Sequence, residues 1–355
     1  MPLSALQDNF TIPLLQWFDL HGRHDLPWQT PRLPYSVYLS EIMLQQTHVQ
    51  TVIPYFERFI KRFPSLQDLA DAPEEDVLTL WSGLGYYARA RNLHKTAKIL
   101  CTEFSGQFPT EPEQLKTLPG IGASTAAAIA SLAFHRPVAI LDGNVKRVLA
   151  RYFKIPGALN HPSTEKTLRP YAEQCVSPER ASDYTQAIMD LGALCCKKTS
   201  PLCHHCPVHP TCLAFQTHTV EEFPHPSPKK TLPSKTSPFF IIQCTDPLQK
   251  TSVCLEKRPD KGIWGGLWCL PMQAPSSHTE QILFCTHKHV FTHFRLTMHV
   301  YLLTSLVELL VTPHTQWITA EQLPHIGVPA PIRYLLGVFF ENLDAHYQQH
   351  ARSFG

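Results

Sequence analysis

The sequence is poor in charge and has no long apolar run. Only 17% of its 355 residues are charged, and lysine and arginine exceed aspartate and glutamate by two. So small an excess does not indicate a protein that binds polyanions over its whole surface. No apolar run approaches the roughly 18 residues of a membrane-spanning helix, and the first residues resemble no secretory signal. We therefore expect a soluble chain, and the 43% of apolar residues can form sizeable cores.

Internal repeats are also lacking, and the composition instead changes twice along the chain. Residues 1–216 predict an all-α domain, because apolar residues recur at helical spacing in 36–47, 65–81, 86–100, 124–134, 143–153 and 181–194. Residues 217–238 contain five prolines and predict an extended linker. Residues 239–345 predict an α/β or α+β domain, followed by a tail at 346–355. Its expected strands are Phe239–Cys244, Ser252–Lys257 and His289–Leu303, and its expected closing helix is Ile332–Asn342.

Four of the eleven cysteines form a cluster. The other seven are scattered, as small buried side chains are, and the odd total argues against a disulfide scaffold. Cys196, Cys203, Cys206 and Cys212 form a C-x6-C-x2-C-x5-C pattern that predicts a metal centre. Zinc is the commonest occupant of four clustered cysteines, but its sites usually contain two C-x2-C pairs. The loose outer spacing favours a cubane iron–sulfur cluster, and spacing alone leaves both metals open.

A tight turn between two helices is predicted at Leu118-Pro-Gly-Ile-Gly122. Its two glycines, Gly120 and Gly122, permit a backbone path that a Cβ would obstruct. The alanine-rich helix that begins near Ala123 presents backbone N–H groups at its N-terminus, which can bind an anion such as a phosphate. Such a turn is also common between packed helices of any bundle, so both interpretations remain.

Two carboxylates are candidates for acid–base chemistry. Glu41 lies in a predicted helix one turn from Val37, Tyr38 and Leu44, so desolvation should raise its pKa and let it act as a general acid. An exposed helical glutamate is the ordinary alternative. Asp142 precedes a predicted helix as its N-cap, where amides and the helix dipole should keep it ionised. An acid and a carboxylate whose pKa values are pushed apart can cleave a glycosidic bond.

Taken together, these segments resemble the helix-hairpin-helix family of DNA glycosylases, and within it the MutY-type adenine glycosylases. The resemblance covers residues 8–215 closely and 238–340 more loosely. It is carried by Leu26–Trp28, Ser40–Thr47, Gly83–Asn92, Leu118–Gly122, Leu141–Val145, Gln186–Gly192 and the four cysteines. It implies a base-excision-repair enzyme that binds double-stranded DNA as a monomer, in the cytoplasm and with the nucleoid if bacterial. It also implies a [4Fe–4S] cluster on Cys196, Cys203, Cys206 and Cys212.

The resemblance further implies the role of each matching residue. Such an enzyme flips an adenine mispaired with 8-oxoguanine or guanine out of the duplex and hydrolyses its glycosidic bond. Glu41 resembles the proton donor, Asp142 the group that stabilises the oxocarbenium-like sugar, and Asn144 a residue that orders both. The adenine pocket would contain Trp28, Gln29 and Gln186. The wedge in the base stack would be Gln46 with Tyr86, and further DNA contacts would come from Thr47, Leu84, Gly85, Gly120, Gly122, Ser124 and Leu141.

One position separates two related activities. Strand-nicking glycosylases of the endonuclease III type carry a lysine two residues after the second hairpin glycine, where this chain has Ser124. A hydroxyl cannot form the imine, so we expect a monofunctional glycosylase. Lys146 could trap an abasic sugar, although a solvated or phosphate-facing lysine is the favoured interpretation. A bifunctional lyase and a non-catalytic iron–sulfur DNA-binding protein remain the alternative functions.

The C-terminal domain resembles the Nudix-like module of this family. The resemblance rests on Glu256–Pro259, Ile263–Pro271 and Phe291–Phe294. The sequence after Pro271 lacks the acidic box that binds Mg²⁺ in Nudix hydrolases, which favours recognition over hydrolysis. In the family a Phe-Ser-His loop reads 8-oxoguanine, and this chain has Thr292 and His293 at the corresponding positions. A histidine buried in the core is the alternative for the latter.

Basic residues collect in two stretches that contain no acid, although neither half of the chain is basic as a whole. The first, residues 77–101, contains Arg89, Arg91, Lys95 and Lys98, and the second, residues 143–164, contains Lys146, Arg147, Arg151 and Lys154. Both stretches include or follow a predicted DNA-reading motif. The sequence therefore predicts a basic DNA-binding face on a nearly neutral body.

Overall fold

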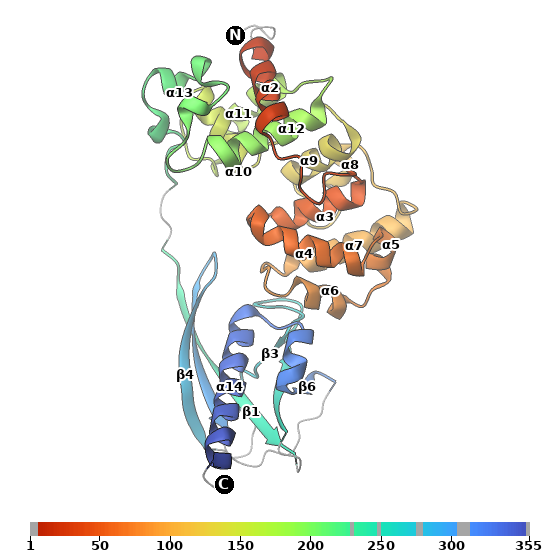
Figure 1. The fold of residues 1–355 in the computed structure, drawn as a ribbon, viewed down its shortest axis with the longest axis vertical. Coiled ribbons are helices and arrows are strands. Elements are labelled where there is room, and N and C mark those ends of the chain that lie inside the picture. Colours follow the sequence, from red (N-terminus) through yellow and green to blue (C-terminus); the bar gives the residue numbers. More distant parts are fainter. Residues whose placement is uncertain (1–5, 228–230, 247–249, 275–279, 304–312, 353–355) are drawn as a thin grey trace. The chain divides into compact units, whose positions relative to one another are not determined.

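The chain divides into two compact units in a computed structural model that describes residues 6–227, 231–246, 250–274, 280–303 and 313–352. The first unit consists of Met1–Asp71 with Asn92–Lys229, and the second of Ala72–Arg91 with Lys230–Gly355. Figure 1 shows that helices build the first unit, whereas strands and one long helix dominate the second. In the described ranges, no helix is both long and apolar enough to cross a membrane.

Helices account for nearly all regular structure before residue 223. They are α2 (Ile12–His21), α3 (Pro34–Leu44), α4 (Val49–Arg62), α5 (Leu66–Asp71), α6 (Glu74–Trp81), α7 (Ala88–Glu103), α8 (Pro112–Leu115), α9 (Ala123–Phe134), α10 (Gly143–Tyr152), α11 (Pro162–Cys175), α12 (Ala181–Asp190) and α13 (Leu213–Gln216). The expected single helix over 65–81 is wrong, because Pro73 separates α5 from α6. Proline cannot donate an amide hydrogen bond, and it disfavours helical dihedrals in the preceding residue.

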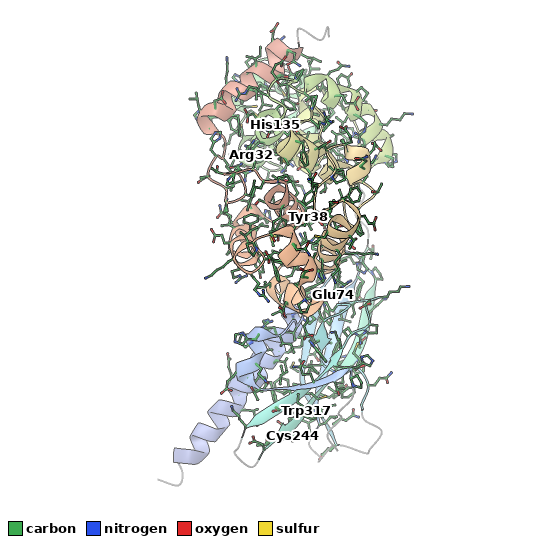
Figure 2. The ribbon with its side chains drawn as sticks, turned by 90° about the vertical axis from the view of Figure 1, so that its right-hand side faces the viewer. Arg32, Tyr38, Glu74, His135, Cys244 and Trp317 are labelled. Carbon is green, nitrogen blue, oxygen red and sulfur yellow. The ribbon has the colours of Figure 1, made fainter. Side chains whose placement is uncertain are left out.

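The alanine-rich helix α9 lies at the centre of the first unit. Residues Ala126–Leu132 are buried, and both α3 and α12 pack against this helix. Small side chains permit this close approach of backbones. Tyr38 of α3 is fully buried and is labelled within the helical unit in Figure 2. The core therefore fixes α3, α9 and α12, which carry site residues, relative to one another.

The turn between α8 and α9 requires glycine at one position. Gly120 has φ +78°, a backbone conformation that other residues adopt at a cost of roughly 1–2 kcal/mol. A Cβ there would lie 2.8 Å from Cβ of Asn92. Gly122 is the N-cap of α9 with an ordinary negative φ, and a Cβ there would meet no atom within 4 Å. The predicted hairpin turn is therefore present, and only its first glycine is sterically required.

A mixed sheet forms the body of the second unit. Its strands are β1 (Ser234–Thr245), β2 (Thr251–Lys257), β3 (Trp268–Cys269), β4 (Gln281–Val290), β5 (Arg295–Leu303) and β6 (Thr315–Ile318). The strand order is β3-β2-β1-β5-β4, with β6 paired to β2; β1 and β5 run parallel and the other pairs antiparallel. The closing helix α14 (Ala330–Arg352) packs on the sheet through the Phe284–Phe339 ring contact (Figure 1).

Three boundaries in this part differ from the sequence prediction. The expected strand His289–Leu303 is two strands, because the chain reverses where the amide of Phe291 donates to the carbonyl of Phe294 at 2.8 Å. Strand β1 begins at Ser234, inside the predicted linker 217–238, because pairing with β5 extends that far. Helix α14 continues to Arg352, through most of the expected tail; residues 353–355 lie outside the described ranges.

Residues 72–91 belong to the same compact unit as the sheet. The indole Nε1 of Trp268 donates to Glu75 Oε1 of α6 at 2.6 Å, and the guanidinium of Arg91 donates to the carbonyl of Gly265. The hydroxyl of Ser82 donates to the carbonyl of Val328 at 3.0 Å. These side-chain hydrogen bonds join α6 and the loop after it to the C-terminal part of the chain.

Candidate active site

A pocket of about 510 Å³ in the helical unit brings most of the predicted catalytic residues together. Four segments supply its lining: the loop before α3, the C-terminal half of α3 with the loop that follows, the N-terminal ends of α9 and α10, and the last turns of α12. The predicted site residues that line it are Trp28, Glu41, Gln46, Thr47, Ser124, Asp142, Asn144 and Gln186. These residues come from segments up to 158 positions apart, so the pocket exists only in the folded chain.

Glu41 has the electrostatic environment that its sequence neighbours indicated. It lies on α3 between Ser40 and Ile42, both of which are buried. Burial, with a smaller contribution from the charge of Asp142, raises the pKa of Glu41 to about 8. The expectation of a raised pKa is therefore confirmed, and the carboxyl can keep a proton at neutral pH.

Asp142 is the N-cap of α10, as predicted. Its Oδ1 accepts from the amide of Val145 at 2.7 Å. Burial nevertheless raises its pKa, while hydrogen bonds from the amides of Val145 and Asn144 and the charges of Arg147 and Lys146 lower it. The expectation that the pKa values of the two carboxyls move in opposite directions is wrong, because the same pocket desolvates both. The amides and the two cations are the groups that favour the ionised form of Asp142.

Some residues assigned to the adenine pocket or to DNA contact lie elsewhere. Gln29 does not line the pocket; its Oε1 accepts from the amide of Leu26 at 3.2 Å, closing the loop that carries Trp28. Leu141 is buried and does not line the pocket either. The sequence assigned these residues by their place in a motif, and a motif does not state which side of the chain faces a cavity.

Several pocket residues were not predicted from the sequence. They include Arg23, Gln45, His48 and Met189. Met189 follows Gln186 by three positions on α12, so helical spacing could have identified it. Arg23 precedes the first motif and carries no pattern of its own. Only the fold brings it beside α12, where it pairs with Asp190.

The two predicted wedge residues have unusual backbone conformations. Gln46, in the loop after α3, has φ +58°, and Tyr86, in the loop after α6, has φ +50°. Both side chains are exposed. Non-glycine residues with positive φ are uncommon, and they cluster at sites where function requires a particular presentation. The loop of Tyr86 is held by Arg89, which donates to the carbonyls of Leu84 and Gly85 at 3.2 Å each.

Thr292 and His293 occupy the turn between β4 and β5, and both are exposed. A buried core position for His293 is therefore wrong. The aromatic ring of Phe291 stacks on that of Phe294 beneath the turn, with centroids 4.5 Å apart. The turn thus presents a hydroxyl and an imidazole on a support of packed rings.

The four clustered cysteines line one cavity of the helical unit. Cys196, Cys203, Cys206 and Cys212 share its wall with Cys195, which the sequence prediction grouped with the scattered cysteines. In the ranges that the structure describes, no three His, Cys, Asp or Glu side chains are arranged around a single metal ion. The thiols surround a cavity, an arrangement that a multi-atom cluster requires and a single ion does not.

Arg151 holds the cysteine loop from inside. It is 3% exposed, and its guanidinium donates to the carbonyls of Lys197 at 2.7 Å and Phe223 at 2.9 Å and contacts Cys196 Sγ at 3.3 Å. One turn earlier, Arg147 donates to Asn144 Oδ1 at 3.0 Å and to the carbonyl of Cys196 at 2.9 Å. One guanidinium thus joins the pocket and the cysteine loop.

The predicted basic face is therefore wrong for several of its members. Arg89 and Arg151 are buried, and Arg147 donates to protein carbonyls. Lys146 forms an ion pair with Glu165 at 2.6 Å. These side chains stabilise the fold of their own unit, whereas Lys95 and Lys98, for example, are exposed.

Comparisons with known proteins agree with this architecture. Residues 39–174 match the model of the HhH-GPD superfamily of base excision DNA repair proteins, and residues 247–337 match that of the NUDIX domain. A thermostable thymine-DNA glycosylase superposes with a TM-score of 0.55 at 27% identity, covering 60% of this chain and 98% of its own. An endonuclease III in a non-covalent DNA complex shares the fold with a TM-score of 0.52 at 21% identity, covering 61% and 98%.

Relatives that match nearly the whole chain carry a single name. The adenine DNA glycosylase of Buchnera aphidicola subsp. Baizongia pistaciae is 38% identical over 342 residues, 92% of this chain and 95% of the relative. That of Homo sapiens is 32% identical over 404 aligned positions, 93% of this chain and 74% of the relative. The predicted order of a helical glycosylase domain and a Nudix-like domain is confirmed. This chain belongs to the adenine DNA glycosylase family of base excision repair.

Proposed function

We propose that this adenine DNA glycosylase removes adenine from A:8-oxoguanine and A:G mispairs in double-stranded DNA and leaves an abasic site. The observation that carries the proposal is the meeting of Glu41 and Asp142 in one pocket with Gln186 and Trp28. A pocket of this kind accommodates a base that has been extruded from the duplex, since a stacked base exposes too little of its surface to be reached.

Glu41 is assigned the role of proton donor to the adenine ring. Its raised pKa keeps the proton available near neutral pH, and protonation makes the base a better leaving group. Asp142 is assigned the stabilisation of the positive charge that develops on the sugar, with Asn144 beside it. The amides of Val145 and Asn144 support the ionised form of Asp142 that this role needs.

We assign a monofunctional reaction to the pocket. Ser124 lines it at the position where a lyase carries its lysine, and a hydroxyl cannot form an imine with the abasic sugar. The ammonium of Lys146 is occupied by Glu165. Neither group is therefore expected to cleave the strand.

We further propose that Cys196, Cys203, Cys206 and Cys212 hold a [4Fe–4S] cluster. Their common cavity and the hydrogen bond from Arg151 to Cys196 Sγ support the assignment, because thiolate ligands are stabilised by such donors. When bound, the cluster supplies four bonds that cross-link the loop after α12. We assign reading of the 8-oxoguanine to the exposed Thr292 and His293, and the wedge to Gln46 and Tyr86.

A glycosylase assay tests the catalytic assignment. We expect Glu41→Gln to bind an A:8-oxoguanine duplex like the unchanged protein but to release adenine about 10²- to 10⁴-fold more slowly, the usual contribution of a general acid. Glu57→Gln, on the exposed face of α4, is the matched control and should keep full activity. Full activity of Glu41→Gln would remove the proton-donor role. Strand breakage without alkali in the unchanged protein would show that the monofunctional assignment is wrong.

A further inference from the structure

A buried carboxylate lies behind the base pocket and has no assigned role. Asp190 is the last residue of α12 and is completely buried. Its Oδ1 accepts from Nε of Arg23 at 2.9 Å and from Nε2 of Gln186 at 2.9 Å, and it forms an ion pair with Nη2 of Arg23 at 2.5 Å. Its Oδ2 accepts from the backbone amide of Arg23 at 2.7 Å. Arg23 and Gln186 both line the pocket, whereas Asp190 does not.

The hydrogen bond to Asp190 fixes the orientation of the Gln186 amide. A glutamine side chain presents an acceptor on one arm and a donor on the other, and the two are easily exchanged by rotation. An ionised carboxylate only accepts, so the arm of Gln186 that faces Asp190 must be its NH₂ group. The acceptor, Oε1, is then left for a ligand in the pocket. Rotation would place the two oxygen atoms together and leave a buried carboxylate lone pair unpaired.

We infer that Asp190, held by Arg23, is a positioning residue that makes the pocket specific for a purine with a hydrogen-bond donor at its 6-position. Adenine carries an amino group there, which donates to a fixed carbonyl oxygen, and the pairing of a glutamine amide with adenine follows this pattern. A 6-oxo purine places an acceptor against the same oxygen and is rejected. The inference rests on the proposed function, because it concerns the base that enters the same pocket.

A substitution that lets the amide rotate tests the inference. In Asp190→Asn the new amide can donate to Gln186, so that the NH₂ group of Gln186 no longer has a fixed direction. The measurement is the single-turnover excision rate for adenine and for unsubstituted purine, each opposite 8-oxoguanine, with the full-length protein. We expect the adenine-to-purine rate ratio to fall about tenfold, the effect of losing one discriminating hydrogen bond of about 1.4 kcal/mol.

A second variant separates positioning from stability. In the double variant Asp190→Asn with Gln186→Glu, the carboxylate at position 186 can only accept, whichever way it rotates, and the amide introduced at position 190 can donate to it. We expect this pair of substitutions to restore most of the adenine-to-purine ratio. A residue that merely stabilised the fold would give no such restoration.

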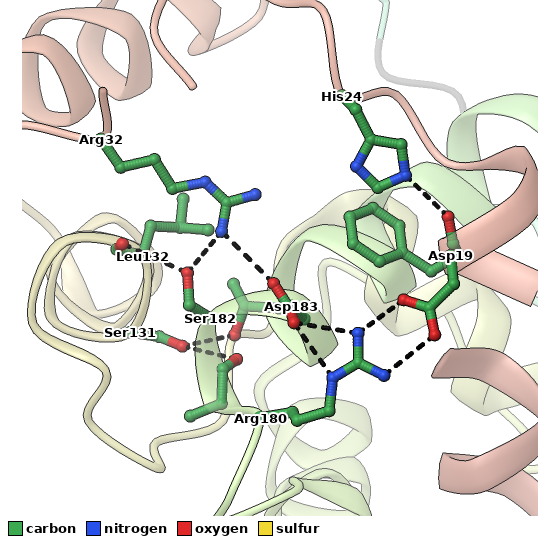
Figure 3. A network of polar contacts seen from close by, with 11 residues as sticks. Asp19, His24, Arg32, Ser131, Leu132, Arg180, Ser182 and Asp183 are labelled. Atoms are coloured by element: carbon green, nitrogen blue, oxygen red, sulfur yellow. Dashed lines mark hydrogen bonds and ion pairs between the residues drawn. The ribbon is translucent and has the colours of Figure 1, made fainter. Parts of the chain in front are cut away.

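Asp183→Asn is the control on the same helix. Asp183 is 37% exposed and pairs with Arg180 at 3.0 Å and with Arg32 at 3.6 Å, as Figure 3 shows. This variant should keep the ratio of the unchanged protein.

Each outcome decides between the inference and the proposed function. If the unchanged protein excises adenine and Asp190→Asn keeps its ratio within twofold, the inference fails and the function stands. If both Asp190 variants lose the folded circular-dichroism signal, Asp190 acts in stability alone and the inference also fails. Failure of the unchanged protein to excise adenine would instead count against the proposed function.

Discussion

At the scale of single residues, burial decides the behaviour of the catalytic carboxyls. Glu41 and Asp142 share one pocket, and burial raises the pKa of both. What distinguishes them is the set of hydrogen-bond donors, because only Asp142 accepts from the first amides of a helix. The N-cap position thus favours the charged form of one carboxyl, while the apolar surroundings favour the neutral form of the other.

The pKa of Glu41 gives a prediction for the dependence of activity on pH. If the protonated carboxyl is the catalyst, the single-turnover rate of adenine release should fall as pH rises through about 8, where Glu41 loses its proton. A rate that stays constant from neutral pH to well above this value would contradict the assignment of Glu41 as the acid.

The same shift predicts how the stability of Glu41→Gln depends on pH. The folded protein holds the Glu41 proton more tightly than the unfolded chain, whose pKa is near 4.5, so stability from this group is complete below that value. It is lost progressively as pH rises toward about 8. The melting temperature of Glu41→Gln should therefore exceed that of the unchanged protein increasingly as the pH rises from the unfolded value toward the folded one. Glu57→Gln should show no such trend.

At the scale of elements, α10 connects two sites. Its N-cap, Asp142, belongs to the pocket, and its last turn contains Arg151, which holds the cysteine loop. Arg147, between them, contacts both sides. Because α10 is only ten residues long, a displacement of the cysteine loop is expected to alter the start of the helix as well.

Two adjacent cysteines provide a test at this scale. Cys196 is assigned as a cluster ligand, and Cys195 lines the same cavity but donates to the carbonyl of Leu202 at 3.3 Å. We expect Cys196→Ser to lose bound iron and the visible charge-transfer absorbance, because one of four thiolates is removed. Cys195→Ser should keep both. Stoichiometric zinc in a colourless unchanged protein would overturn the cluster assignment.

At the scale of the whole molecule, the contact-based units do not follow the order of the sequence. Residues 72–91, which lie within the matched glycosylase model, pack with the C-terminal sheet. The loop that carries Tyr86 is closed at both ends by one carbonyl: Val328 accepts from Ser82 at 3.0 Å and from Tyr87 at 3.5 Å. Arg333 of α14 also donates to the Ser82 hydroxyl at 3.1 Å. The proposed wedge loop is therefore supported by residues far away in sequence.

This support predicts a change in the dynamics of the loop. In Arg333→Met, the amides of residues 82–87 should exchange with solvent about tenfold faster or more, since a hydrogen bond from a charged group is worth about 1.5–3 kcal/mol. Arg295→Met, at an exposed position of β5, is the matched control. Unchanged exchange in the loop would show that residues 72–81 alone determine its order.

The sequence by itself determined the identity of the family, the two domain types and the catalytic carboxyls. These depend on local properties: apolar spacing along α3, an N-cap before α10, and a hairpin turn that needs glycine at 120. Each can be recognised within a few residues, because the physical requirement is met by neighbours in the chain.

Only the tertiary structure decided which side chains meet. It placed Arg23 and Asp190 behind Gln186, turned Gln29 away from the pocket, and buried Arg89 and Arg151, which the sequence had assigned to a basic face. The sequence also could not show that residues 72–91 pack with the C-terminal sheet. Burial and hydrogen bonding between distant segments depend on packing, and packing fixes a direction for each side chain that no local pattern encodes.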